Sequence, residues 1–167
     1  DTRHKAIRHQ QFNGYVTEEV IPFIHSQCGG RVMTITAGAS FGALHSANTL
    51  FRRPDLIDGC IAMSGAYDLK DYTKGYWDED VYFNSPIDYL PNLTDEGTLA
   101  HLRAKSHIHF VGGQGAYGLD PGDVLGNAAE IRCHQILVEQ HVHQRQEQQS
   151  VGARQRRQMH IGQGGRP

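Results

Sequence analysis

Residues 31–51 read RVMTITAGASFGALHSANTLF and contain a strand signal, a glycine-rich turn and a helix signal in immediate succession. Residues 31–37 are rich in β-branched side chains and predict a short buried strand. Residues 43–51 place apolar side chains at the spacing of one helix face, namely Ala43, Leu44, Ala47, Leu50 and Phe51. Between them stands Gly38-Ala39-Ser40-Phe41-Gly42, so the sequence predicts a strand, a tight turn and a helix in that order.

The Gly-x-Ser-x-Gly turn carries the candidate chemistry. In a strand–turn–helix of this kind the serine sits on a strained bend, with its hydroxyl exposed above the sheet. We expect Gly38 and Gly42 to be required because side chains at both positions would clash across the bend. The N-terminus of the following helix would present backbone N–H groups to a developing oxyanion. Ser40 is therefore predicted as a nucleophile, and the alternative is a glycine-rich phosphate-binding turn.

Further strand and helix signals lie on both sides of this stretch. Residues 15–28 predict a helix that starts near Thr17 and stops at Gly29-Gly30, with Pro22 in its first turn or at a bend. Later strands are predicted at residues 57–63, 108–111 and 136–139, a weak helix over 123–133, and a long segment without period over 71–97. This alternation implies an α/β fold with a mostly parallel sheet and crossover helices.

Composition divides the chain into two parts. Residues 1–143 predict one partial α/β domain, and residues 144–167, which are rich in Gln, Arg and Gly, predict a basic, disordered tail. The 167 residues carry 16 Lys and Arg against 18 Asp and Glu, but five Arg and only one Glu lie in the tail, so the domain is acidic. An acidic domain argues against nucleic acid as a partner. No apolar run reaches the ~20 residues of a membrane helix, so no membrane is expected either.

The cysteines bear on the cellular compartment. Cys28, Cys60 and Cys133 form no CxxC pair, and their number is odd. This usage favours a reducing compartment or inert buried thiols over a disulfide framework. The expected location is the cytoplasm.

Two stretches resemble a known family. Residues 36–69, TAGASFGALHSANTLFRRPDLIDGCIAMSGAYDL, and residues 75–93, GYWDEDVYFNSPIDYLPNL, are similar to an esterase family of α/β-hydrolases. That family is related to S-formylglutathione hydrolase (esterase D), feruloyl esterases and mycolyltransferases. The resemblance implies that Ser40 is the nucleophile and that the Phe41 backbone N–H is one oxyanion donor. It also implies that the chain is the C-terminal part of an α/β-hydrolase fold, truncated at its N-terminus and atypical after about residue 130.

The same resemblance implies where the rest of a catalytic triad should lie. The acid is expected after the strand at residues 108–111, where Asp120 is the first carboxylate and Asp123 is the reserve candidate. The base is expected after the last strand, where His143 is preferred over His141. The histidine would take the Ser40 proton and pass it to the leaving alkoxide.

Two other groups of side chains have both a functional and a structural interpretation. His107, His109, His141 and His143 could converge on Zn²⁺, but neither HExxH nor a cysteine pair accompanies them, so no metal is expected. His45 is expected to be a packed or surface histidine. The aromatic residues proposed as a substrate-pocket wall are Tyr67, Tyr76, Trp77 and Tyr82. Their alternative role is to pin a long loop to the core.

The sequence therefore predicts a serine esterase that acts on a small-molecule carboxylic ester and needs no cofactor. The alternatives are a non-catalytic member of the same family and a carbohydrate-binding module that uses the aromatic segment 67–89. A further expectation concerns the strand at residues 32–37. If it lies at an edge, it lacks the Lys, Pro or bulge that protects natural edges, so self-association is expected there.

Overall fold

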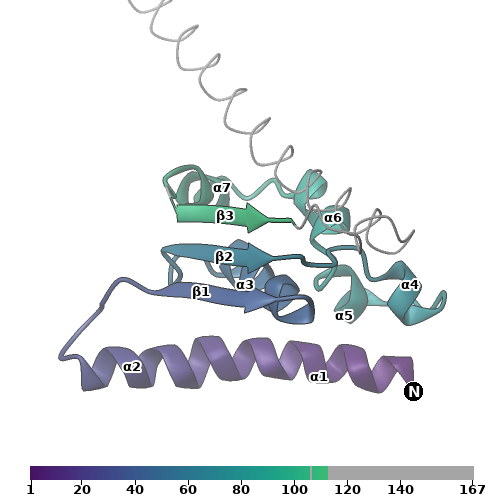
Figure 1. Cartoon of the computed structure of the whole chain (residues 1–167), viewed down its shortest axis with the longest axis horizontal. Helices are drawn as coiled ribbons and strands as arrows, with labels where there is room; N and C mark the ends of the chain where they lie inside the picture. The colour runs from purple at the N-terminus through teal and green to yellow at the C-terminus, as the bar shows by residue number, and fades with distance from the viewer. Residues whose placement is uncertain (106, 113–167) are drawn as a thin grey trace, which may run out of the picture.

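The computed structural model describes residues 1–105 and 107–112 (Figure 1). Within these residues three parallel strands form one sheet in the order β1 (Ile35–Ala39), β2 (Gly59–Met63), β3 (His107–Val111). Helix α3 (Phe41–Arg52) connects β1 to β2, and α7 (Glu96–Arg103) precedes β3. The predicted α/β class with a parallel sheet and crossover helices is confirmed at this level. None of the helices in this part of the chain is long and apolar enough to cross a membrane.

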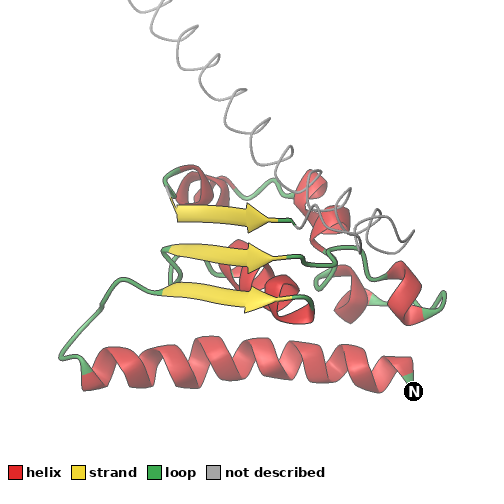
Figure 2. Cartoon of the chain, in the orientation of Figure 1, coloured by secondary structure: helices red, strands yellow, loops and turns green. Residues whose placement is uncertain are grey.

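A helical rod precedes the sheet, and it is longer than predicted. It consists of α1 (Thr2–Gly14), the π-helical segment η1 (Tyr15–Val20) and α2 (Ile21–Gln27), which run on as one rod (Figures 1 and 2). The prediction of a helix start near Thr17 is wrong, since the rod begins at Thr2 with the Asp1 side chain as its N-cap. Pro22 lies at the start of α2 but inside the continuous rod, so the predicted place in the first turn of the helix is wrong. Because Pro22 has no N–H to donate, the wider π turns fall directly before it.

The rod ends at Gly29 and Gly30, which adopt backbone conformations that favour glycine. Gly29 and Gly30 both have positive φ, at 75° and 149°. The Gly30 N–H donates to the His25 carbonyl at 2.9 Å, and the Gly29 N–H donates to the Ser26 carbonyl at 3.3 Å. This is the Schellman pattern of helix ends, and it confirms the predicted stop.

The first strand starts later than predicted. Residues 31–34 are not strand. Here the Asp58 carboxylate accepts from the Thr34 N–H at 2.8 Å and from Arg31 at 2.7 Å, and the Asp58 N–H donates to the Thr34 carbonyl at 2.8 Å. Pairing begins at Ile35, which lies opposite Gly59, and it extends through the Gly38–Ala39 part of the turn motif. The second strand likewise begins at Gly59 rather than at residue 57.

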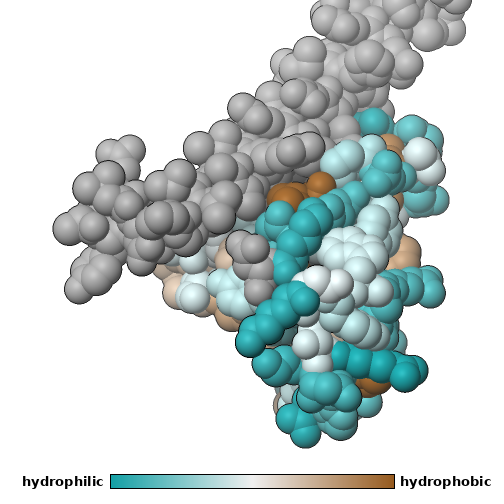
Figure 3. Space-filling model, turned by 90° about the vertical axis from the view of Figure 1, so that its right-hand side faces the viewer, coloured by the Kyte–Doolittle hydropathy of each residue, from teal (hydrophilic) through white to brown (hydrophobic). Residues whose placement is uncertain are grey.

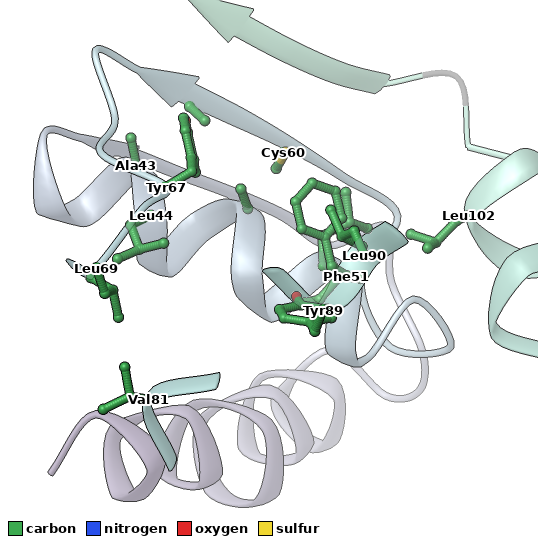
Figure 4. Packing of buried hydrophobic residues seen from close by; sticks show 14 of the residues in the cluster. Ala43, Leu44, Phe51, Cys60, Tyr67, Leu69, Val81, Tyr89, Leu90 and Leu102 are labelled. Atoms are coloured by element: carbon green, nitrogen blue, oxygen red, sulfur yellow. The ribbon is translucent and has the colours of Figure 1, made fainter. Parts of the chain in front are cut away.

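The hydrophobic core lies between one sheet face and α3. From α3, Leu44 and Phe51 pack toward Cys60 of β2 (Figure 4). The Thr36 hydroxyl of β1 also points to this side, where it donates to the Ser46 carbonyl at 2.9 Å. Burial raises the pKa of the Cys60 thiol to about 12, as expected for an inert core cysteine. Cys28, in contrast, is exposed.

The segment after β2 contains short helices where the sequence predicted no regular structure. They are α4 (Lys70–Thr73), α5 (Glu79–Tyr82), α6 (Pro86–Tyr89) and the 3-10 turn η2 (Leu90–Asn92). One-turn helices are too short to show a hydrophobic period. Buried polar contacts hold them to α3: Asn48 donates to the Asn84 side chain at 3.1 Å and accepts from the Tyr89 hydroxyl at 2.7 Å.

Candidate active site

The turn between β1 and α3 is strained at Ser40. This residue has φ 54° and ψ −121°, a backbone conformation that is uncommon for any residue other than glycine. Its N–H donates to the Met63 carbonyl at 2.9 Å, which extends the β1–β2 ladder by one bond. The strained residue is therefore fixed by the sheet on one side and by α3 on the other. This is the backbone that the Gly-x-Ser-x-Gly pattern predicts.

The two glycines of the motif have unequal roles. A Cβ at Gly38 would lie 2.2 Å from the Gly42 carbonyl oxygen and 3.0 Å from the Ala43 nitrogen, so only glycine fits there. A Cβ at Gly42 would meet none of the described atoms within 4 Å. The expectation that both positions exclude a side chain is confirmed for Gly38 and wrong for Gly42. The reason is that the bend brings the backbone at Gly42 onto the α-carbon of Gly38, while the α-carbon of Gly42 itself faces open space.

Backbone N–H groups face the region beyond the turn. The first backbone hydrogen bonds at the start of α3 run from Ala43 and Leu44 to the Ser40 carbonyl, at 3.0 and 3.4 Å. The N–H groups of Phe41 and Gly42 precede them, so they have no acceptor within the helix. They also lie at the positive end of the α3 dipole, which favours an anion at this position. The predicted oxyanion donor, Phe41, is thus in a suitable place next to the strained serine.

A second strained serine ends the neighbouring strand. Ser64 follows β2 with φ 49°, and its N–H donates to the Val111 carbonyl at 2.8 Å. Ser40 and Ser64 therefore lie at the carboxyl ends of adjacent parallel strands, the edge at which open α/β sheets bind ligands. Figure 3 shows the molecule from the side toward which these strand ends point, where hydrophilic residues cover much of the surface. Sequence reasoning missed Ser64, although Ser64-Gly65 directly after a strand was a usable signal.

No family model, curated protein or solved structure matches this chain.

Two histidines and two phenylalanines pack together between α1 and the start of α3, next to the turn. The His45 ring lies 4.1 Å from that of His9, 4.6 Å from that of Phe12 and 5.2 Å from that of Phe41, measured between ring centroids. Burial lowers the pKa of His45. It lowers the pKa of His9 further, to about 3, with smaller contributions from the neighbouring His45 and Arg52. Both rings are therefore neutral at pH 7, and His45 is packed, which is one of the two alternatives that the sequence predicted.

The other predicted triad residues lie outside the described part of the chain. They are Asp120, Asp123, His141 and His143. Two of the four candidate metal-binding histidines can be placed: His107 and His109 lie on the same exposed face of β3. Among the described residues no group of His, Cys, Asp or Glu is arranged to hold a metal ion.

The predicted pocket aromatics do not form one wall. Tyr67 is fully buried and packs edge-on against Phe110, with ring centroids 5.4 Å apart, so it is part of the core. The Tyr76 hydroxyl donates to Asp78 at 2.5 Å. Trp77 is exposed and packs edge-on against Tyr82, at 6.5 Å. For Tyr67 the alternative role, pinning the loop to the core, is the better description.

Proposed function

We propose that this chain is a serine carboxylic-ester hydrolase with an α/β-hydrolase fold, and that Ser40 is its nucleophile. The observation that carries the proposal is the left-handed backbone of Ser40 between a parallel strand and a helix N-terminus. A strained residue persists only where the surrounding structure holds it, and such residues cluster at functional sites. The steric requirement for glycine at position 38 supports the same interpretation.

The chemistry follows from the groups around the turn. The Ser40 hydroxyl oxygen attacks the acyl carbon, and its proton passes to a histidine, for which His143 and then His141 are the candidates from the sequence. The carbonyl oxygen becomes an oxyanion that the Phe41 N–H and the α3 dipole stabilise. The histidine returns the proton to the leaving alkoxide, and water then releases the acid from Ser40. Asp120, or Asp123 in its place, would orient the histidine.

A labelling experiment with a matched control tests this proposal. A fluorescent fluorophosphonate should label the wild-type chain, and Ser40→Ala should remove the label. Ser40→Ala should also reduce hydrolysis of p-nitrophenyl acetate by at least ~10³-fold, as expected for a triad that acts as a unit. Ser64→Ala is the control. Ser64 also has a positive φ and lies at a strand end, but no helix begins directly after it.

The outcomes separate the alternatives. Labelling lost only in Ser40→Ala supports the nucleophile. Wild-type protein that is neither labelled nor active is the non-catalytic member of the family, and the proposal then fails. Labelling that survives Ser40→Ala would mean that the reactive serine lies elsewhere.

A further inference from the structure

A cavity of about 240 Å³ lies between α1, the start of α3 and the segment after β2. Its closed end is apolar, since the lining residues Ala6, Leu69 and Val81 are only 8%, 6% and 1% exposed. Figure 4 shows Leu69 and Val81 facing one another across a gap. The volume exceeds that of an engineered cavity of about 150 Å³ that holds benzene. A ligand with one ring and a short substituent therefore fits.

Two aromatic side chains mark the open side of the cavity. Phe41 and Tyr72 both line it, and they are 42% and 57% exposed. Their rings meet edge-on, with centroids 6.0 Å apart. Because aromatic rings attract one another in edge-on and offset arrangements, a further ring beside them gains more than the burial of its area alone. The lining therefore favours an aromatic ligand over an aliphatic one.

Lys5 places a positive charge on the same lining. Lys5 is exposed, and no described residue forms an ion pair with its ammonium group. The other titratable side chain of the described lining, His9, is neutral at pH 7 because its pKa is about 3. On the segment after β2, the carboxylates of Asp68 and Asp88 already bind Lys70, at 3.6 and 2.7 Å. The Lys5 charge is therefore left for a ligand.

The buried polar side chains of the lining are satisfied within the protein. The Thr73 hydroxyl donates to the Lys70 carbonyl at 3.1 Å, and the Asn84 amide donates to the Asp80 carbonyl at 2.6 Å. Breaking these bonds would be costly, and a carboxylate at the closed end would lose its hydration. We therefore expect the polar group of a ligand at the open side, within reach of Lys5.

We propose that this cavity binds a small aromatic carboxylate, with its ring in the apolar space and its carboxylate paired with the Lys5 ammonium at the open side. Lysine carries its charge on a flexible four-carbon stem, so the ammonium can follow a carboxylate at the rim. Phe41 contributes its ring to the cavity, but Ser40 does not line it. The site is therefore separate from the proposed nucleophile, and the inference goes beyond the proposed esterase function.

Fluorine NMR of two matched probes on the full chain tests the proposal. 4-Fluorophenylacetate and 4-fluorophenylacetamide have the same ring and nearly the same shape, but only the first is charged. We expect saturable shift or broadening of both resonances at low ionic strength, where charge effects are strongest. The dissociation constant of the carboxylate should be about fivefold lower, an effect between those of an exposed ion pair and of a charge-assisted hydrogen bond.

Three variants locate the probes. Lys5→Met keeps most of the side-chain length but removes the charge, so it should make the two probes bind equally. Arg8→Met is the matched control: Arg8 is exposed on the same helix but does not line the cavity, so the preference for the carboxylate should remain. Ala6→Leu should fill the closed end and weaken both probes.

The remaining outcomes overturn the proposal. It fails if wild-type protein binds neither probe, or if it binds both with equal affinity, and these two results need no variant to fold. It also fails if Lys5→Met keeps the preference, or if Arg8→Met abolishes it, because the preference would then reflect the general surface charge. If Ser40→Ala weakens 4-fluorophenylacetate as much as Lys5→Met does, the probe occupies the strand-end site and the proposal fails as well. Esterase activity is not part of the readout, so this inference and the proposed function can fail independently.

Discussion

The two faces of the β-sheet differ sharply in what covers them. In β2, Cys60 and Ala62 point to α3 and are completely buried, whereas their neighbours Ile61 and Met63 point the other way and are 37% and 39% exposed. The same alternation holds in β1 and β3, where Ile35 is 42% and Val111 is 51% exposed. Strand residues of similar hydrophobicity therefore lie either in a close-packed core or on an open apolar surface.

The covered face also fixes the candidate active site. The close contact between Gly38 and the Gly42 carbonyl joins the end of β1 to the first turn of α3. Strain at Ser40 can persist because this contact and the core beneath α3 hold both ends of the turn. The open face makes no comparable contribution within the described residues. Substitutions on the covered face, which packs on α3, should therefore change both the folding stability and the conformation of the turn at Ser40. Substitutions on the opposite, open face should change mainly what the surface binds.

The largest expected effect comes from opening the covered face. Phe51 is 1% exposed and stacks on Phe110 with ring centroids 6.4 Å apart. Phe51→Ala should lower the free energy of unfolding by about 3–5 kcal/mol, the usual cost of such a cavity. Met63→Ala on the open face should cost less than ~1 kcal/mol, because its side chain is only partly removed from water. Urea denaturation of both variants measures this, and equal costs would abolish the distinction between the faces.

A smaller effect is expected from the two glycines of the turn. Gly38→Ala should cost about 3 kcal/mol, at the upper end for overpacking, because the atoms it meets at 2.2 and 2.4 Å are backbone and cannot rotate away. Gly42→Ala is the matched control: it adds the same methyl group to open space inside a helix, where alanine is favoured by up to ~1 kcal/mol. Thermal unfolding distinguishes them, and a tolerated Gly38→Ala would show that the turn can relax.

The sequence was informative where the signal is local. Strand, turn and helix around Ser40 could be predicted because the turn needs glycine at 38 and because Ala43, Leu44 and Phe51 share one helix face. The predicted first strand starts too early because residues 31–34 include the β-branched Val32 and Thr34. In the structure the Thr34 N–H donates to the side chain of Asp58, 24 residues later, and no local pattern contains that contact.

The sequence was uninformative where burial is polar or elements are short. Helix α1 has no apolar period, since two of its three buried residues are His9 and Asn13. Among the one-turn helices, α5 is capped by the Asp78 side chain, and Asn48 holds the segment around α6 through Asn84 and Tyr89, 36 and 41 residues away. The open sheet face could not be foreseen either, because Ile61 and Met63 are as apolar as a buried strand requires. For the triad, Asp120 and His143 remain predictions.

Acid should destabilise the fold where the helical rod contacts α3, because His9 of the rod is buried against His45 there. The pKa of His9 is about 3 in the folded chain against an ordinary value of 6.5, so below pH 6.5 the unfolded chain binds a proton that the folded chain does not. The free energy of unfolding should therefore decrease as the pH is lowered, by about 2 kcal/mol from pH 7 to pH 5. The loss would continue until about pH 3. His9→Phe should flatten this dependence. If that variant keeps the wild-type slope, His9 is not the titrating group.

The smallest expected change in folding stability, and the clearest change in assembly, comes from the open face. This face includes the exposed apolar Ile35 of β1. Among the described strands β1 pairs only with β2, so it is an edge strand, and residues 35–39 contain no Lys or Pro. Such an edge, next to an apolar face, is expected to associate with another chain. Wild-type protein should therefore elute as a dimer or larger species in size-exclusion chromatography and bind a hydrophobic dye.

Ile61→Lys should shift it toward monomer, because a charge buried between two sheets is costly. Ala100→Lys adds the same charge on exposed α7 and should leave the elution unchanged. A monomeric wild-type chain that unfolds cooperatively above ~50 °C, in the range of ordinary stable domains, would show that the open face needs no partner.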